Sequence, residues 1–316
     1  DHLDGGLRPS TIIELAKKEA IKLPANTESE LGDWFYENIS TKNNQIFNKF
    51  ELTISLMQNF DNFERIAYEA VEDLRNQDVA YGELRFAPFQ HLNDNFKLNE
   101  IVKSAYSGIK QGEKDFGGEF NIILCAMRQH DNSKEVAELA IRSIEDKVVG
   151  FDLAGPEYNF PPSKHLEACL MINESDIGLT IHAGEAADIS YIEEAVFECK
   201  ADRIGHGWQI IYGCEETEEM YIPSDKISNF IHLHQIPLEI CISSNVKSGA
   251  SEVNIANHPA VKLIKGGFNI TLNTDNRLMA KTSIKNEFMI ARNRLDLDNK
   301  DEKRVIENSF KAIFSI

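Results

Sequence analysis

The residues GLTIHAGE, at positions 178–185, place a short apolar run directly before a histidine and a glutamate. Residues 178–182 are mostly apolar or β-branched and have turn or polar neighbours, which is typical of a strand buried on both faces. Such a strand would present His182 at its end, and Gly184 permits a tight turn that brings Glu185 to the same end of the strand. The pattern predicts chemistry at the carboxyl end of a buried strand.

Six similar runs lie on either side of this one, and helical patterns separate them. The predicted strands are residues 79–87, 120–127, 147–153, 178–182, 201–205, 236–242 and 268–272. Alternating strands and helices indicate a parallel sheet. An eighth strand would end near residue 2, and eight βα units predict a closed TIM-type (β/α)8 barrel rather than an open sheet.

Amphipathic patterns predict helices around this barrel. The predicted helices are residues 10–22, 63–75, 134–144, 189–199, 258–264, 284–294 and 302–313. The first should open after Pro9, with Thr11 and Glu14 as a capping box. Residues 28–62 are predicted to be an irregular helical insertion. Because a barrel takes roughly 250 residues, residues 1–316 fit a single domain with extra helices.

The composition is that of a large acidic protein. The chain has 316 residues, 42% of them hydrophobic, which is ample for one core. Its formal charge of −18 arises from 51 acidic and 33 basic residues. Such a surface repels polyanions, so nucleic-acid polymers are not expected as partners, whereas a neutral small molecule is compatible.

The cysteines and the hydropathy pattern bear on location. The five cysteines are odd in number, widely spread and without a C-x-x-C pair. This is typical of reduced thiols, so we expect a cytoplasmic protein. No apolar run approaches the roughly 20 residues that span a bilayer, and no signal peptide is visible, so no membrane partner is expected. The sequence leaves the oligomeric state open.

Four short motifs each stand at the carboxyl end of a predicted strand, where a TIM barrel builds its active site. They are HLDG at 2–5, HAGE at 182–185, IGHG at 204–207 and LNTDN at 272–276. Each alone has an ordinary explanation, because a histidine beside an aspartate is usually a surface pair and an aspartate can cap the next helix. Their shared position at strand ends favours one common site.

Histidine nitrogens and an aspartate oxygen at these strand ends match a divalent ion with nitrogen and oxygen ligands. Zinc, one ion per chain, is the first choice because catalytic zinc keeps an open position for water, although the residues do not exclude another divalent metal. A metal there would lower the pKa of bound water, and Glu185 could shuttle a proton.

The motifs HLDG, HAGE, GHG, SSN and NTDN, in this order and spacing, resemble the adenosine deaminase branch of the metal-dependent amidohydrolase superfamily. Residues 151–155 (FDLAG) and 81–86 (YGELRF) are similar to further strand ends of that family. The resemblance covers nearly the whole chain. It implies zinc-dependent hydrolysis of adenosine, and of 2′-deoxyadenosine, to inosine and ammonia by attack of metal-bound hydroxide on purine C6.

The resemblance also implies roles for the residues of the reaction centre. His2, His182 and Asp275 would be metal ligands, with His2 as the second histidine of the family's H-x-H pair. Glu185 would protonate purine N1. His206 would hold the metal-bound water and help to deprotonate it. We therefore count Glu185, His206 and Asp275 as the catalytic set.

A second group of residues would bind the substrate. By the same resemblance, Gly155 would offer its backbone N–H to purine N3 and Asp4 would contact the ribose 5′ end. Phe47 and Phe50 resemble the aromatic lid over the purine, although ordinary helix packing explains them equally well. Asn276 stands where many members carry Asp, and its amide can donate to purine N7 without being protonated. Residues 243–245 (SSN) should support the mouth of the site.

One departure concerns the metal. The first histidine of the H-x-H pair would fall one position before Asp1, so we expect it upstream of this sequence. The remaining histidines show no ligand pattern and are predicted to be core or surface residues; they are His91, His130, His165, His232, His234 and His258.

Three alternatives remain beside adenosine. The substrate could be a related aminopurine, such as adenine or a modified adenosine. A catalytically inactive, deaminase-like binding protein is disfavoured because Glu185, His206 and Asp275 are all present. An NAD-linked α/β enzyme is disfavoured because no G-x-G-x-x-G follows an early strand.

Overall fold

A computed structural model describes residues 1–37, 45–248 and 254–314, and its central feature is a curled parallel sheet. Seven strands lie in the order β1-β2-β3-β4-β5-β8-β9, and every neighbouring pair is parallel. Their bounds are β1 Tyr81–Phe86, β2 Glu119–Met127, β3 Val148–Ala154, β4 Gly178–Ala183, β5 Arg203–His206, β8 Leu238–Ile240 and β9 Ile270–Leu272. Each overlaps one of the predicted strands.

Asp1 and His2 occupy the position of the eighth strand and connect the two edges of the sheet. The amide of Arg85 in β1 donates to the carbonyl oxygen of Asp1 at 2.9 Å. On the other side, the His2 amide donates to the carbonyl oxygen of Asp275, just after β9, at 2.7 Å. His2 also forms a parallel bridge with Arg85. These contacts close the ring at its carboxyl end, which confirms the predicted TIM-type barrel.

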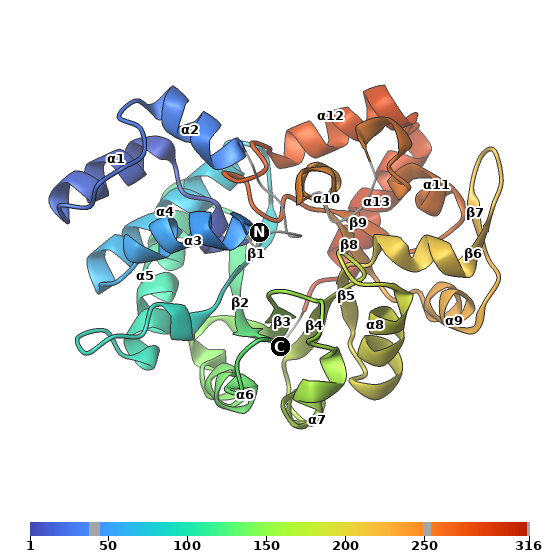
Figure 1. The fold of residues 1–316 in the computed structure, drawn as a ribbon, viewed down its shortest axis with the longest axis horizontal. Helices are drawn as coiled ribbons and strands as arrows, with labels where there is room; N and C mark the ends of the chain where they lie inside the picture. The colour runs from blue at the N-terminus through green and yellow to red at the C-terminus, as the bar shows by residue number, and fades with distance from the viewer. Residues whose placement is uncertain (38–44, 249–253, 315–316) are drawn as a thin grey trace.

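Helices surround the strands, as Figure 1 shows for α4 to α8 and α13. The helices that follow barrel strands or close the chain are α5 Leu98–Phe116, α6 Ser133–Arg142, α7 Leu166–Asn173, α8 Ile189–Glu193, α9 Lys226–His234, α10 Ile242–Ser248, α11 Ala260–Lys265, α12 Ile284–Leu295 and α13 Asn299–Lys311. Those before β1 are α1 Pro9–Lys18, α2 Glu28–Tyr36, α3 Gln45–Ser55 and α4 Phe60–Arg75. The described part of residues 28–62 thus carries α2, α3 and the start of α4, whereas residues 38–44 lie outside the described residues.

The core explains why the strands are short apolar runs. Every residue of β3, β8 and β9 is buried, because side chains of a barrel strand point alternately into the barrel and toward the helices. Polar side chains are nevertheless buried along the barrel strands as well as at their carboxyl ends, among them Thr180, Arg203 and Glu239. Among the described residues, no helix combines the length and the hydropathy that crossing a membrane requires.

Several local predictions were wrong. The proposed capping box does not form: α1 already begins at Pro9, its N-cap Arg8 has no side-chain capping bond, and the Thr11 hydroxyl instead donates to Glu69 at 2.5 Å. A proline fits the first helical position because its missing N–H has no partner there in any case. Helices α5, α7, α9 and α10 and an antiparallel hairpin, β6 Cys214–Glu216 with β7 Tyr221–Pro223, were not predicted.

Candidate active site

The predicted catalytic residues meet at the carboxyl end of the barrel. His182 lies at the end of β4 and His206 is the last residue of β5, whereas Asp275 follows β9. These side chains and Glu185 line one cavity of about 480 Å³. At these strand ends a glycine or a residue with left-handed backbone lets the chain turn sharply; φ is +61° at His206 and +55° at Asp275. His2 lines the same cavity, so the geometry brings together residues as far apart in sequence as His2 and Asp275.

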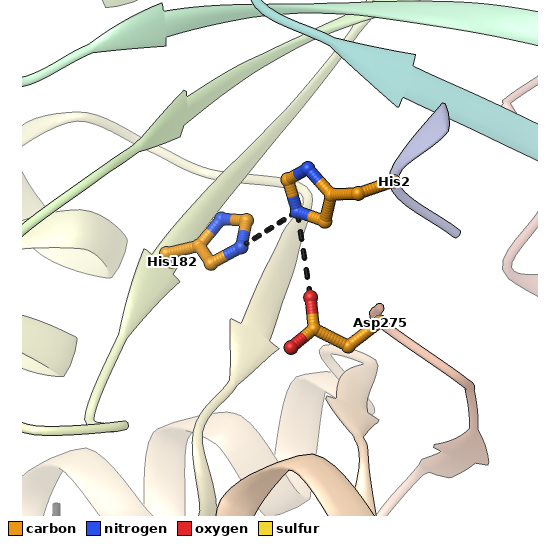
Figure 2. Close-up of side chains that lie close together, drawn as sticks. All are labelled: His2, His182 and Asp275. Carbon is orange, nitrogen blue, oxygen red and sulfur yellow. Dashed lines mark hydrogen bonds and ion pairs between the residues drawn. The ribbon is translucent and has the colours of Figure 1, made fainter. Parts of the chain in front are cut away.

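Three side chains present metal-binding atoms to one point, as Figure 2 shows. Ligand atoms of His2, His182 and Asp275 all lie within 4.8 Å of one another. The Nε2 atom of His2 is 3.3 Å from Nε2 of His182 and 3.5 Å from Oδ1 of Asp275. Two ligands bound tetrahedrally to one zinc ion would be about 3.3 Å apart, given bonds of roughly 2.0–2.1 Å. The donor set therefore fits a single metal ion.

Asp152 in β3 orients the His182 ring. Its Oδ1 accepts a hydrogen bond from Nδ1 of His182 at 3.0 Å, so Nε2 of His182 turns its lone pair toward the metal-binding point. Burial by itself would raise the pKa of Asp152, but His182 and Arg85 hold it well below its usual range. Asp152 lies within the FDLAG motif, yet sequence reasoning gave it no role.

Arg85 links Asp152 to a second carboxylate inside the barrel. Its guanidinium contacts Asp152 at 3.2 Å and Glu239 in β8 at 2.7 Å. Glu239 also pairs with Arg203 at 2.8 Å, and these four side chains are almost fully buried. Buried charges need such partners because an isolated ion in the interior is costly. The network thus connects Asp152, the hydrogen-bond partner of His182, to paired charges in the interior of the barrel.

Helix α10 supports two of the predicted catalytic side chains. The Ser244 hydroxyl donates to Oδ2 of Asp275 at 2.5 Å, which leaves Oδ1 for the metal-binding point. The Asn245 amide lies 2.9 Å from Nδ1 of His206. Nε2 of His206 faces Glu185, whose Oε2 is 3.7 Å away. Two residues of the SSN motif, Ser244 and Asn245, thus contact residues of the predicted catalytic set.

Glu157 holds the loop that carries Glu185, and sequence reasoning missed it. Its carboxylate accepts the backbone N–H groups of Glu185, Ala186 and Ala187 at 3.2, 2.7 and 2.5 Å. Burial raises the pKa of Glu185, and the nearby charges of Asp275 and Glu157 act in the same direction against His206. A raised pKa keeps a carboxylic acid protonated closer to neutral pH, which suits a proton donor.

The predicted substrate-binding residues line the same cavity. Asp4, Gly155 and Asn276 all contribute to its wall, as does Phe50 from α3. Oδ1 of Asp4 and Oδ1 of Asn276 are buried without a hydrogen-bond partner among the described residues. Burial raises the pKa of Asp4 to about 7. The Phe47 side chain lies outside the part of the chain whose side chains are described.

Comparisons with known proteins agree with this geometry. The adenosine deaminase family model matches residues 1–315. The adenosine deaminase of Mycobacterium marinum is 38% identical and aligns with 99% of this chain and 88% of its own length. Adenosine deaminase 1 of Streptomyces coelicolor is 40% identical over 91% of this chain and 74% of its own length.

A solved structure supports the fold. The adenine deaminase of Arthrobacter aurescens superposes with a TM-score of 0.87 over 100% of this chain and 92% of its own, at 23% identity. At that identity the likeness concerns the barrel, whereas the family follows from the sequence relatives and the family model. By these matches the chain belongs to the adenosine deaminase family of hydrolytic enzymes.

Proposed function

We propose that the protein hydrolyses adenosine, and 2′-deoxyadenosine, to inosine and ammonia at this site. The observation that carries the proposal is the convergence of His2, His182 and Asp275 on one point beside Glu185 and His206. Net, the purine C6–N bond breaks and a C6–O bond forms, while the protons of water go to purine N1 and to the leaving ammonia. The named relatives are adenosine deaminases, which favours this substrate.

His2, His182 and Asp275 would hold the metal. Zinc is the ion we propose, because two imidazole nitrogens and one carboxylate oxygen leave a coordination position open. When bound, the ion would supply a water of lowered pKa. The carboxyl group of Glu185 would then deliver a proton to purine N1, and His206 would hold the attacking oxygen in place.

The purine would be fixed from its other edges. The Gly155 backbone N–H would reach N3, and the Asn276 amide would turn its NH₂ toward N7. Phe50 would cover the ring from α3. Asp4 would meet a ribose hydroxyl. Its buried Oδ1 has no hydrogen bond among the described residues, and this feature favours a nucleoside over free adenine.

The charge of the cavity favours a neutral substrate over a phosphorylated one. Among the described lining residues there is no lysine or arginine, whereas Asp4, Glu51, Glu157, Glu185 and Asp275 all contribute carboxyl groups. A 5′-phosphate would find no positive partner near these carboxylates. We therefore expect adenosine 5′-monophosphate to be a much poorer substrate than adenosine.

The ultraviolet spectrum of the purine tests the proposal. Adenosine mixed with the purified, zinc-loaded protein should acquire the spectrum of inosine, and a chelator should stop the change. Adenine and adenosine 5′-monophosphate, assayed in parallel, should react at least about 100-fold more slowly, as expected when a polar partner is lost or repelled. If adenine reacted faster than adenosine, the related aminopurine would be the substrate. If none of the three compounds reacted, a binding protein would be favoured.

The location and organisation belong to the same proposal. All five cysteines are free thiols, which is the state expected in a reducing compartment, and we propose a cytoplasmic protein. We also propose that residues 1–316 act as one domain around this single site.

A further inference from the structure

A series of hydrogen bonds runs from the backbone of α11 to His206. The backbone N–H of Ala260 donates to Nδ1 of His258 at 3.2 Å. Nε2 of His258 lies 3.3 Å from Oδ1 of Asn245, and Nδ2 of Asn245 lies 2.9 Å from Nδ1 of His206. We call His258 and Asn245 the relay. None of the motif reasoning gave His258 a function.

The direction of each hydrogen bond in the relay follows from the direction of the first hydrogen bond. A backbone N–H can only donate, so Nδ1 of His258 is an acceptor and, in the neutral ring, the hydrogen sits on Nε2. The ring is 3% exposed, and burial lowers the pKa of His258 to about 3, which keeps it neutral. Nε2–H therefore donates to Oδ1 of Asn245, and this fixes which way the Asn245 amide points.

The same logic reaches His206. Because Oδ1 of Asn245 is committed to His258, the Asn245 NH₂ group donates to Nδ1 of His206. Nδ1 of His206 then has no hydrogen, and in the neutral imidazole Nε2 carries it. Nε2 is the atom that faces the cavity, 3.7 Å from Oε2 of Glu185. At the reaction centre the ring thus presents an N–H group and no lone pair.

We propose that His258 is a positioning residue that acts through Asn245 to keep the hydrogen of His206 on Nε2, so that His206 serves the reaction as a hydrogen-bond donor and not as a base. The role of His206 as a hydrogen-bond donor in the reaction rests on the proposed function. It refines the role that the family resemblance implied for His206. A donor fixed at that place orients the attacking oxygen and stabilises negative charge that develops on it. The tautomer itself depends only on the relay.

The tautomer can be read directly by ¹⁵N NMR of histidine-labelled, zinc-loaded protein, because the shifts of the two ring nitrogens report which one is protonated. The wild-type protein should show His206 protonated at Nε2. His258→Phe keeps the bulk but releases the Asn245 amide, so a mixture of His206 tautomers should appear. Asn245→Asp replaces the donor by an acceptor and should move the hydrogen of His206 to Nδ1.

Kinetics give the second readout. For His258→Phe we expect kcat to fall about 10-fold, and for Asn245→Asp about 100-fold or more, with KM within about 3-fold of wild type, since the lost hydrogen bond acts on developing charge. Metal content should stay unchanged. The matched control is His91→Phe, which makes the same replacement at a buried histidine packed between Phe63 and Phe86 and should leave both the His206 signals and kcat unaltered.

Two results would overturn the proposal: His206 protonated at Nδ1 in the wild type, or wild-type signals and kcat in a folded His258→Phe variant. If that variant does not fold, Asn245→Asp decides on its own, because an unmoved tautomer there contradicts the relay. A wild-type protein that leaves adenosine unchanged would refute the proposed function in the first assay, and the NMR arm would still decide the tautomer.

Discussion

Replacing Asp152 by asparagine should weaken metal binding although Asp152 is not a ligand. The carboxylate accepts the Nδ1–H of His182 at 3.0 Å, which leaves Nε2 of His182 free to bind the metal. An asparagine of nearly the same shape can turn its NH₂ group toward Nδ1, and this would place the hydrogen of His182 on Nε2 instead. The ligand atom would then have to lose that hydrogen before it could bind.

The structure sets the size of this effect. An outer partner of a metal-bound histidine is typically worth about 10- to 100-fold in metal affinity, which corresponds to about 1.4–2.7 kcal/mol. Fold stability should fall as well, because Asp152 is fully buried and Arg85 loses one of its two carboxylate partners. The loss should stay below the roughly 3–5 kcal/mol of a fully broken buried pair, since Glu239 remains 2.7 Å from Arg85.

The assay is competition between the protein and a zinc chelator of known affinity, read alongside the thermal midpoint of the metal-free protein. Glu239→Gln is the matched control, because it also removes a carboxylate from Arg85 but makes no contact with His182 among the described bonds. It should lower stability and leave zinc affinity within about 3-fold of wild type, less than the 10-fold expected for an outer partner. Wild-type zinc affinity in Asp152→Asn, or equal losses in both variants, would refute the assignment.

Three further predictions concern the site and the stability of the fold. Glu185→Gln should keep its metal and lose about 10²- to 10⁴-fold in kcat, because only the proton donor is removed; near-normal turnover would dismiss that role. Asp275→Ala should lose its metal in elemental analysis, since one of the three converging ligands is gone, and full occupancy would contradict the site. His91→Phe should flatten the pH dependence of unfolding. Burial lowers the pKa of His91 to about 3, so below the unfolded value near 6.5 only the unfolded chain takes up this proton and stability is lost as the pH falls. Between pH 6 and 4 the slope of the unfolding free energy should decrease by about 1.4 kcal/mol per pH unit, and denaturant titrations showing the wild-type slope would exclude the effect.

The barrel itself could be predicted from sequence because its strands are buried on both faces. A doubly buried strand must be a short apolar run, and residues 148–154 of β3 show this along their whole length. Helix ends were less predictable. Thr11 and Glu14 have the spacing of a capping box, but the Thr11 hydroxyl donates a hydrogen bond to Glu69 of another helix instead. The sequence around Thr11 does not indicate that partner.

The sequence alone determined which residues stand at strand ends, since a motif such as HAGE directly follows the strand that delivers it. It therefore determined His182, Glu185, His206 and Asp275 as candidates, and their residue types indicated a metal. Only the tertiary structure decided how these side chains are oriented. Asp152, Glu157 and His258 act through hydrogen bonds to residues between 13 and 30 positions away along the chain. Such partners come together only when the strands curl into a ring, because a hydrogen bond depends on distance and direction in space and not on spacing in sequence.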